Sequence, residues 1–167
     1  MVLLKQIADI IGYIGTAWLV ISGVIILIAW LKGILVPVWR LGDGLAKRKI
    51  TIFAKGDNQE SFKNLLLDSN LFNNKNIRSI TKPEDLGRCE DSTLYLVVWE
   101  DFGKDINDIL IKKSDKTALI VFAKQNQLQP ADWDVLGKHR NVTIVNFKGR
   151  LMNDILVSLM VSGYDKR

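Results

Sequence analysis

The sequence contains one cysteine, one histidine and no glutamate after Glu100. A single thiol, Cys89, cannot form an internal disulfide, so the chain is not a disulfide-rich secreted domain. Cys89 and His139 together cannot supply the ligands of a common zinc site. The chain also lacks the phosphate-binding loop of P-loop nucleotidases and the Gly-x-Ser-x-Gly turn of serine hydrolases. These absences exclude the commonest catalytic and metal-binding signatures, and no catalytic residue is predicted.

Charged residues are missing from residues 10–31, a segment of 22 positions. A helix of this length spans about 33 Å, enough to cross a hydrocarbon core of about 30 Å. Core helices of soluble proteins seldom run so long without charge, and the segment is longer than the apolar region of a cleaved signal peptide. The sequence therefore predicts a single N-terminal transmembrane helix.

Three parts are expected: residues 1–41 as the transmembrane helix with an interfacial stub, 42–48 as a basic linker, and 49–167 as a cytoplasmic α/β domain. The stub contains Pro37, which favours a kink, and Trp30 and Trp39 suit the headgroup region. Cations are concentrated after the apolar segment: Lys32, Arg40, Lys47, Arg48 and Lys49. This bias predicts a single-pass protein of the inner membrane with its N-terminus outside.

The distribution of charge argues against a nucleic-acid-binding protein. Residues 1–48 carry five Lys/Arg and two Asp, and residues 49–167 carry eighteen Lys/Arg and sixteen Asp/Glu. The net charge of the larger part is therefore only +2, too small for binding of nucleic acid by charge alone. The basic excess lies beside the predicted membrane, where it attracts anionic lipid. The lipid bilayer is thus an expected partner.

Short apolar runs alternate with helix-period segments after residue 48. Strands are predicted at 49–55, 76–80, 93–99, 117–123 and 142–147. Helices are predicted at 57–72, at 81–89, around Ile106–Leu110, at 130–138 and in a closing segment with the stripe Leu151, Ile155, Leu156, Leu159 and Met160. Capping boxes are expected from Asp57 to Glu60 and from Thr81 to Glu84. This alternation predicts a flavodoxin-like, doubly wound, five-stranded parallel sheet of order 2-1-3-4-5.

Ligands of such sheets bind outside the carboxyl ends of the strands, near the switch point. Cations and glycines occur at these ends, and Gly56 and Gly149 would let backbone approach a ligand closely. The arrangement suits an anionic or nucleotide-like ligand, a cyclic oligonucleotide included, although a rim of solvated loops is the alternative. The candidate ligand-binding residues are Lys55, Gly56, Asp57, Asn58, Glu100, Asp101, Lys124, Lys148 and Arg150. No metal site is predicted.

Asp57, Asp101 and Lys148 resemble the acidic residue, phosphoacceptor and lysine of response-regulator receiver domains. The resemblance implies phosphotransfer to Asp101. It departs at the end of the fourth strand, where Ala123 replaces the Ser or Thr of that family.

Bacterial TIR-like domains are similar in architecture. Their NAD-cleaving members have a Ser-x-x-Trp-x-x-x-Glu motif, whereas Trp133 here is followed four positions later by Gly137. The architecture also resembles the Rossmann-type sensors of cyclic oligonucleotides in CRISPR-linked effectors, some of which are membrane-anchored.

Small residues recur within the apolar segment with a period near 3.5. Association of helices in lipid depends on close backbone approach, so a narrow stripe of small residues predicts a self-association seam. The seam residues are Gly12, Gly15, Thr16, Leu19, Ser22 and Gly23. Thr16 and Ser22 could also line a polar path if four or more copies met. The alternative is that small residues are merely tolerated there.

Small single-pass proteins of this design resemble bacterial defence effectors that act on the inner membrane. The sequence favours a membrane-anchored, oligomeric sensor in anti-phage or stress signalling, whose α/β domain binds an anionic ligand or a partner and thereby perturbs the membrane. A constitutive membrane scaffold that docks a protein partner is the alternative. A membrane-tethered NAD-cleaving enzyme is third.

Overall fold

The computed structural model describes residues 2–39, 42 and 48–162. The chain divides into two compact units, Met1–Arg40 and Leu41–Arg167. Most of the predicted basic linker, including Lys47, lies outside the described residues, as does Arg40. The two units are therefore considered separately.

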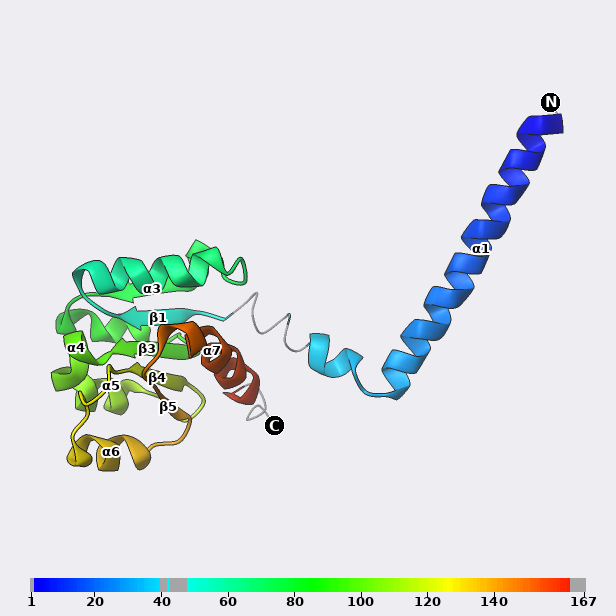
Figure 1. Cartoon of the computed structure of the whole chain (residues 1–167). Helices are drawn as coiled ribbons and strands as arrows, with labels where there is room; N and C mark the ends of the chain where they lie inside the picture. The colour runs from blue at the N-terminus through cyan, green and yellow to red at the C-terminus, as the bar shows by residue number, and fades with distance from the viewer. Residues whose placement is uncertain (1, 40–41, 43–47, 163–167) are drawn as a thin grey trace. The chain divides into compact units, whose positions relative to one another are not determined.

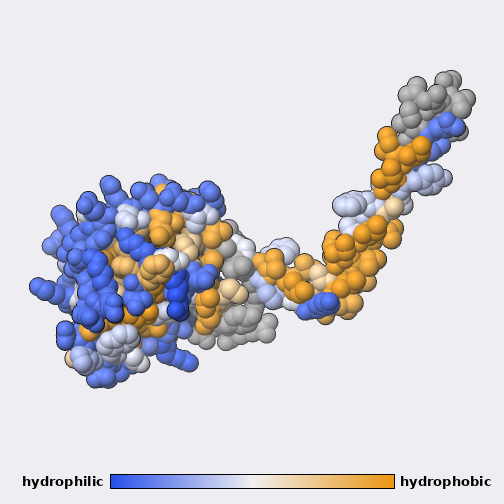
Figure 2. All heavy atoms as spheres, viewed as in Figure 1, coloured by the Kyte–Doolittle hydropathy of each residue, from blue (hydrophilic) through white to orange (hydrophobic). Residues whose placement is uncertain are grey.

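The first unit is dominated by one long apolar helix, α1, from Val2 to Leu31. Its stretch Asp9–Leu31 has a mean hydropathy of 2.3 and is not buried within the chain. Figure 2 shows apolar residues over most of this helix. Length and composition fit a membrane span and equally a signal sequence.

The break after α1 lies at Gly33 rather than at Pro37. Gly33 has a φ of +67°. Its N–H donates to the carbonyl of Trp30, and the N–H of Ile34 donates to that of Ala29. These two bonds form a Schellman motif, which needs a residue in the left-handed region and so favours glycine. Residues 35–39 are helical again, with Pro37 inside this short segment.

The second unit contains the predicted five-stranded, all-parallel sheet of order β2-β1-β3-β4-β5 (Figure 1). This is the flavodoxin-like order, and the fold prediction is confirmed. The strands are β1 (Ile50–Phe53), β2 (Ile77–Ile80), β3 (Leu94–Val98), β4 (Ala118–Phe122) and β5 (Val142–Val145).

Helices connect the strands, as the parallel topology requires. The α-helices are α3 (Gly56–Asp68), α4 (Trp99–Phe102), α5 (Ile106–Lys112), α6 (Pro130–Gly137) and α7 (Lys148–Ser162). Short 3-10 helices are η1 (Asn74–Asn76), η2 (Pro83–Cys89) and η3 (Gly103–Asp105). The segment expected as a helix at 81–89 is therefore a 3-10 helix.

Both faces of the sheet are covered. On one face, α3 and α7 bury the first set of core residues, which includes Ile52, Phe62, Leu96, Ile120 and Ile155. On the other face, η2, α4, α5 and α6 bury the second set, which includes Phe53, Tyr95, Phe102, Ile109 and Leu136. Alternation along each strand sends neighbouring side chains to opposite faces, which explains why every residue of the central strands β1, β3 and β4 is buried. The edge strand β2, with Arg78 and Ser79, is partly exposed.

Neither predicted capping box has the geometry expected. Helix α3 begins earlier, with Lys55 as its N-cap, so Asp57 lies inside the first turn. The 3-10 helix η2 has Lys82 as its N-cap, without a side-chain cap. A capping box does occur at α6, between Gln129 and Asp132. At α3 the predicted capping box is replaced by a tertiary contact, because the carboxylate of Asp101 accepts the N–H of the N-cap Lys55.

Helix α7 packs on the sheet through a narrower stripe of buried side chains than predicted. Leu151, Ile155 and Leu159 are buried, whereas Leu156 is half-buried. Met160 was expected in the stripe, but its side chain is 44% exposed. The helix turns by about 100° per residue, so a stripe repeating every four positions leaves its neighbours at the edge.

Truncation of a core side chain tests this packing. Leu66 of α3 is fully buried, so Leu66→Ala should lower the free energy of unfolding of the α/β unit by about 2–5 kcal/mol. Met160→Ala, a matched control on α7, should change it by less than about 0.5 kcal/mol. Urea unfolding of the full-length protein in detergent, followed by circular dichroism, measures both. Equal losses in the two variants would contradict the packing described.

Candidate functional site

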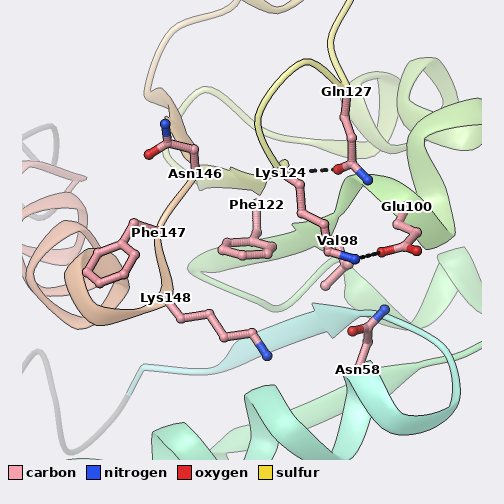
Figure 3. Close-up of a pocket in the computed structure, with 9 residues that line it drawn as sticks. All are labelled: Asn58, Val98, Glu100, Phe122, Lys124, Gln127, Asn146, Phe147 and Lys148. Atoms are coloured by element: carbon pink, nitrogen blue, oxygen red, sulfur yellow. Dashed lines mark hydrogen bonds and ion pairs between the residues drawn. The ribbon is translucent and has the colours of Figure 1, made fainter.

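A pocket of about 430 Å³ opens at the carboxyl ends of β3, β4 and β5 (Figure 3). Its apolar side chains include Val98 and Phe122, which are the last residues of β3 and β4. Polar side chains from α3, α4, the loop after β4 and the start of α7 surround them. The lining residues are Asn58, Val98, Glu100, Phe122, Lys124, Gln127, Asn146, Phe147 and Lys148. Apolar surface with a few convergent polar groups is typical of small-molecule sites, and the volume is in their range.

The two lysines of the pocket differ in their partners. Lys124 Nζ lies 2.6 Å from the Glu100 carboxylate, which balances its charge. Lys148 Nζ donates to Ser61 Oγ at 2.9 Å and lies 4.7 Å from the centre of the Phe62 ring. Among the described residues, no carboxylate lies within ion-pair distance of Lys148. The lining therefore carries one positive charge in excess, and Lys148 holds it.

The loop after β4 is ordered by its own hydrogen bonds. Gln127 Oε1 accepts the N–H of Lys124 at 2.7 Å, and the Gln127 N–H donates to the carbonyl of Lys124 at 3.2 Å. Asn126 has a φ of +64°, a conformation that asparagine tolerates better than most residues. The backbone of Lys124 is thus fixed at the pocket, and its side chain reaches Glu100.

Gly149 lies against the ring of Phe147. A side chain there would place its Cβ 2.6 Å from the ring of Phe147. The glycine therefore leaves room for this ring beside the first turn of α7. The Phe147 side chain is 68% exposed.

Near the switch point between β1 and β3, Asp101 is hydrogen-bonded to the start of α3. Asp101 Oδ2 accepts the N–H of Lys55 at 2.9 Å and the side-chain amide of Asn58 at 3.1 Å. Lys55 Nζ lies 4.9 Å from the centre of the Phe102 ring. Asp101 therefore satisfies the N-cap of α3, and the pocket lies on the other side of β3, over β4 and β5.

The candidate residues thus divide into two groups. Asn58, Glu100, Lys124 and Lys148 line the pocket. The others do not belong to its lining: Lys55, Gly56, Asp57, Asp101 and Arg150. Gly56 has a φ of +50° at the start of α3, Asp57 is exposed in the first turn, and Arg150 pairs with Asp154 at 3.4 Å.

Five lining residues were not predicted: Val98, Phe122, Gln127, Asn146 and Phe147. Val98 and Phe122 end their strands, which was a usable signal, but their apolar character assigned them to the core alone. Gln127 lies three positions beyond Lys124, and nothing in the sequence indicates that the loop returns it to the pocket.

The three receiver-like residues do not form one cluster in the contacts of the described residues. Asp101 bonds to Lys55 and Asn58, Lys148 bonds to Ser61, and Asp57 is exposed. The geometry thus gives the phosphotransfer resemblance no support. Within the described part of the chain, no group of three or more His, Cys, Asp or Glu could hold a metal ion.

Comparisons with known proteins do not indicate a function for this chain. No protein-family model, curated protein or solved structure matches this sequence. The functional argument therefore rests on the pocket and on α1.

The role of Asp101 can be tested directly. Asp101→Ala removes the acceptor for both the Lys55 N–H and Asn58, so it should lower the free energy of unfolding by about 1–2 kcal/mol. Asp101→Asn keeps an acceptor oxygen, so its loss should be smaller. Urea unfolding distinguishes the two variants. A tolerated Asp101→Ala would show that the carboxylate is not needed to hold α3.

Proposed function

We propose that this chain is a single-pass membrane protein whose cytoplasmic α/β unit binds a small anionic ligand, and that binding controls association of α1 with copies of itself. Such a response would make it a membrane-anchored sensor and effector in bacterial anti-phage or stress signalling. The observation that carries the proposal is the pocket with an unbalanced lysine, Lys148, at the carboxyl ends of the strands.

An anion is the ligand class that the pocket favours electrostatically. The Lys148 ammonium has three donors, of which the structure assigns one to Ser61. Hydrogen bonds between an ammonium and a phosphate or carboxylate are charge-assisted and stronger than those between neutral groups. Asn58, Gln127 and Asn146 add amide groups that can orient a polar ligand. Nucleotides belong to this class.

The membrane part of the proposal rests on the apolar length of α1 and on the cations beyond it. A Cβ added at Gly12, Gly15 or Gly23 would meet no atom of the chain within 4 Å. These glycines therefore have no packing role within one copy. Close approach of a second helix gives them a role, because small residues let two backbones come near each other in lipid.

The two hydroxyls of the proposed seam are bonded within α1. Thr16 Oγ1 donates to the carbonyl of Gly12 at 2.8 Å, and Ser22 Oγ donates to that of Trp18 at 2.8 Å. A single helix is therefore stable in lipid without a partner, because its polar groups are satisfied. This supports an association that can be switched, since the separate helix pays no penalty for unpaired hydroxyls.

Removal of the Lys148 charge should weaken anion binding. Lys148→Met should lower the affinity of the full-length protein for inorganic pyrophosphate at least tenfold, because a charge-assisted hydrogen bond is lost. Lys138→Met, at the exposed end of α6, removes the same charge away from the pocket and should have little effect. Isothermal titration calorimetry in detergent measures both. Absence of binding, or equal affinity in both variants, would refute the anion site.

Bulk on the seam should disrupt assembly. Gly15→Leu with Gly23→Leu should reduce the subunit count in detergent, because the added side chains separate the backbones. Ala17→Leu with Val24→Leu adds bulk to a different face of the helix and should leave the count unchanged. Mass photometry provides the measurement. A monomer in every variant would favour the scaffold, in which α1 is only a tether.

A further inference from the structure

We infer that α7 couples the pocket to the point where the chain leaves the α/β unit toward α1. The helix has one end in the pocket and its other end fastened to Arg48, which lies two residues before β1. The inference rests on the proposed function for the ligand, but the fastening of α7 itself does not depend on it.

The start of α7 belongs to the pocket. Lys148 is the first residue of the helix and lines the pocket. Its side chain extends toward α3 (Figure 3). There its ammonium bonds to Ser61 and lies over the ring of Phe62. An anion held by Lys148 therefore contacts α7 at its positive end, where negative charge also interacts favourably with the helix dipole.

The end of α7 is bonded to Arg48, just before the first strand of the α/β unit. The Arg48 guanidinium donates to the carbonyl of Leu159 and, at 2.9 Å, to Ser162 Oγ. The group is partly buried, and this burial lowers the pKa of Arg48, although an arginine remains charged at neutral pH. The Leu159 carbonyl also accepts the Ser162 hydroxyl at 3.4 Å, and a cation at this end of the helix interacts favourably with the helix dipole. In the sequence, Arg48 stands between α1 and β1.

Between its two ends α7 is a single rigid element. It has 15 residues, so it is about 22 Å long. Leu151, Ile155 and Leu159 hold it to the sheet by one narrow buried stripe, while Val157 and Val161 on the outside are exposed. A helix held by one stripe and two terminal contacts can loosen as a unit. Each terminal contact then stabilises the other, and the coupling is reciprocal.

Hydrogen exchange of the full-length protein in detergent tests the coupling without a ligand. Arg48→Met should raise the exchange of amides in both the first and the last turns of α7 by a similar factor, at least threefold. Arg48→Lys, which keeps the charge, should raise it less, and Lys138→Met should leave α7 unchanged. Faster exchange in the last turn alone would overturn the inference. So would an equal rise in α3 and α5, because Arg48 would then stabilise the whole unit.

Inorganic pyrophosphate as a probe separates this inference from the proposed function. In the wild type it should slow exchange at both ends of α7 at least threefold, and Lys148→Met should abolish the effect. Protection of the first turn alone would overturn the coupling and leave the anion site intact. If pyrophosphate has no effect but Arg48→Met still loosens both ends, α7 is a coupled element and the anion site is refuted.

Discussion

Burial of both faces of the three central strands of a five-stranded parallel sheet is the constraint on which the rest of the α/β unit depends. Parallel strands need helical crossovers, and strands buried on both faces need helices on both sides. In the order β2-β1-β3-β4-β5, α3 and α7 share one face. All strands then end at the same edge, where Val98 and Phe122 close the core and begin the pocket. The pocket is therefore a consequence of how the sheet is covered.

Much of this architecture could be predicted from the sequence because it depends on local pattern. The central strands β3 and β4 are uninterrupted apolar runs, and the strand segments alternate with helix-period segments, so the order followed from general rules of handedness. The details that could not be predicted are tertiary. Asp57 stands at capping-box spacing, but Asp101 from a distant segment binds the N-cap Lys55 instead. The chain turns at Gly33, and Pro37, which looked like the stronger signal, lies within a helical segment.

The site shows the same division. Position at a strand end identified Lys124 and Lys148, because the carboxyl ends of parallel strands gather at one edge. Position could not show that Glu100 balances Lys124, that Lys148 meets a hydroxyl and a ring, or that Gly149 leaves room for Phe147. Each of these facts depends on which way a side chain points. Position also could not show that Asp101, at the switch point, bonds to Asn58 and to the N-cap of α3.

A ligand that contacts only the α/β unit can influence α1 solely through a difference in free energy between two states of the protein. Coupling of this kind is typically about 1–3 kcal/mol, or about 5- to 150-fold in an equilibrium constant. A coupling free energy of this size would not dissociate a strong interface between helices. The proposed seam would have the character of a weak one: Thr16 and Ser22 are satisfied within their own helix, and the glycines would add backbone proximity but little surface. An association near balance is the kind that a modest signal through α7 can shift.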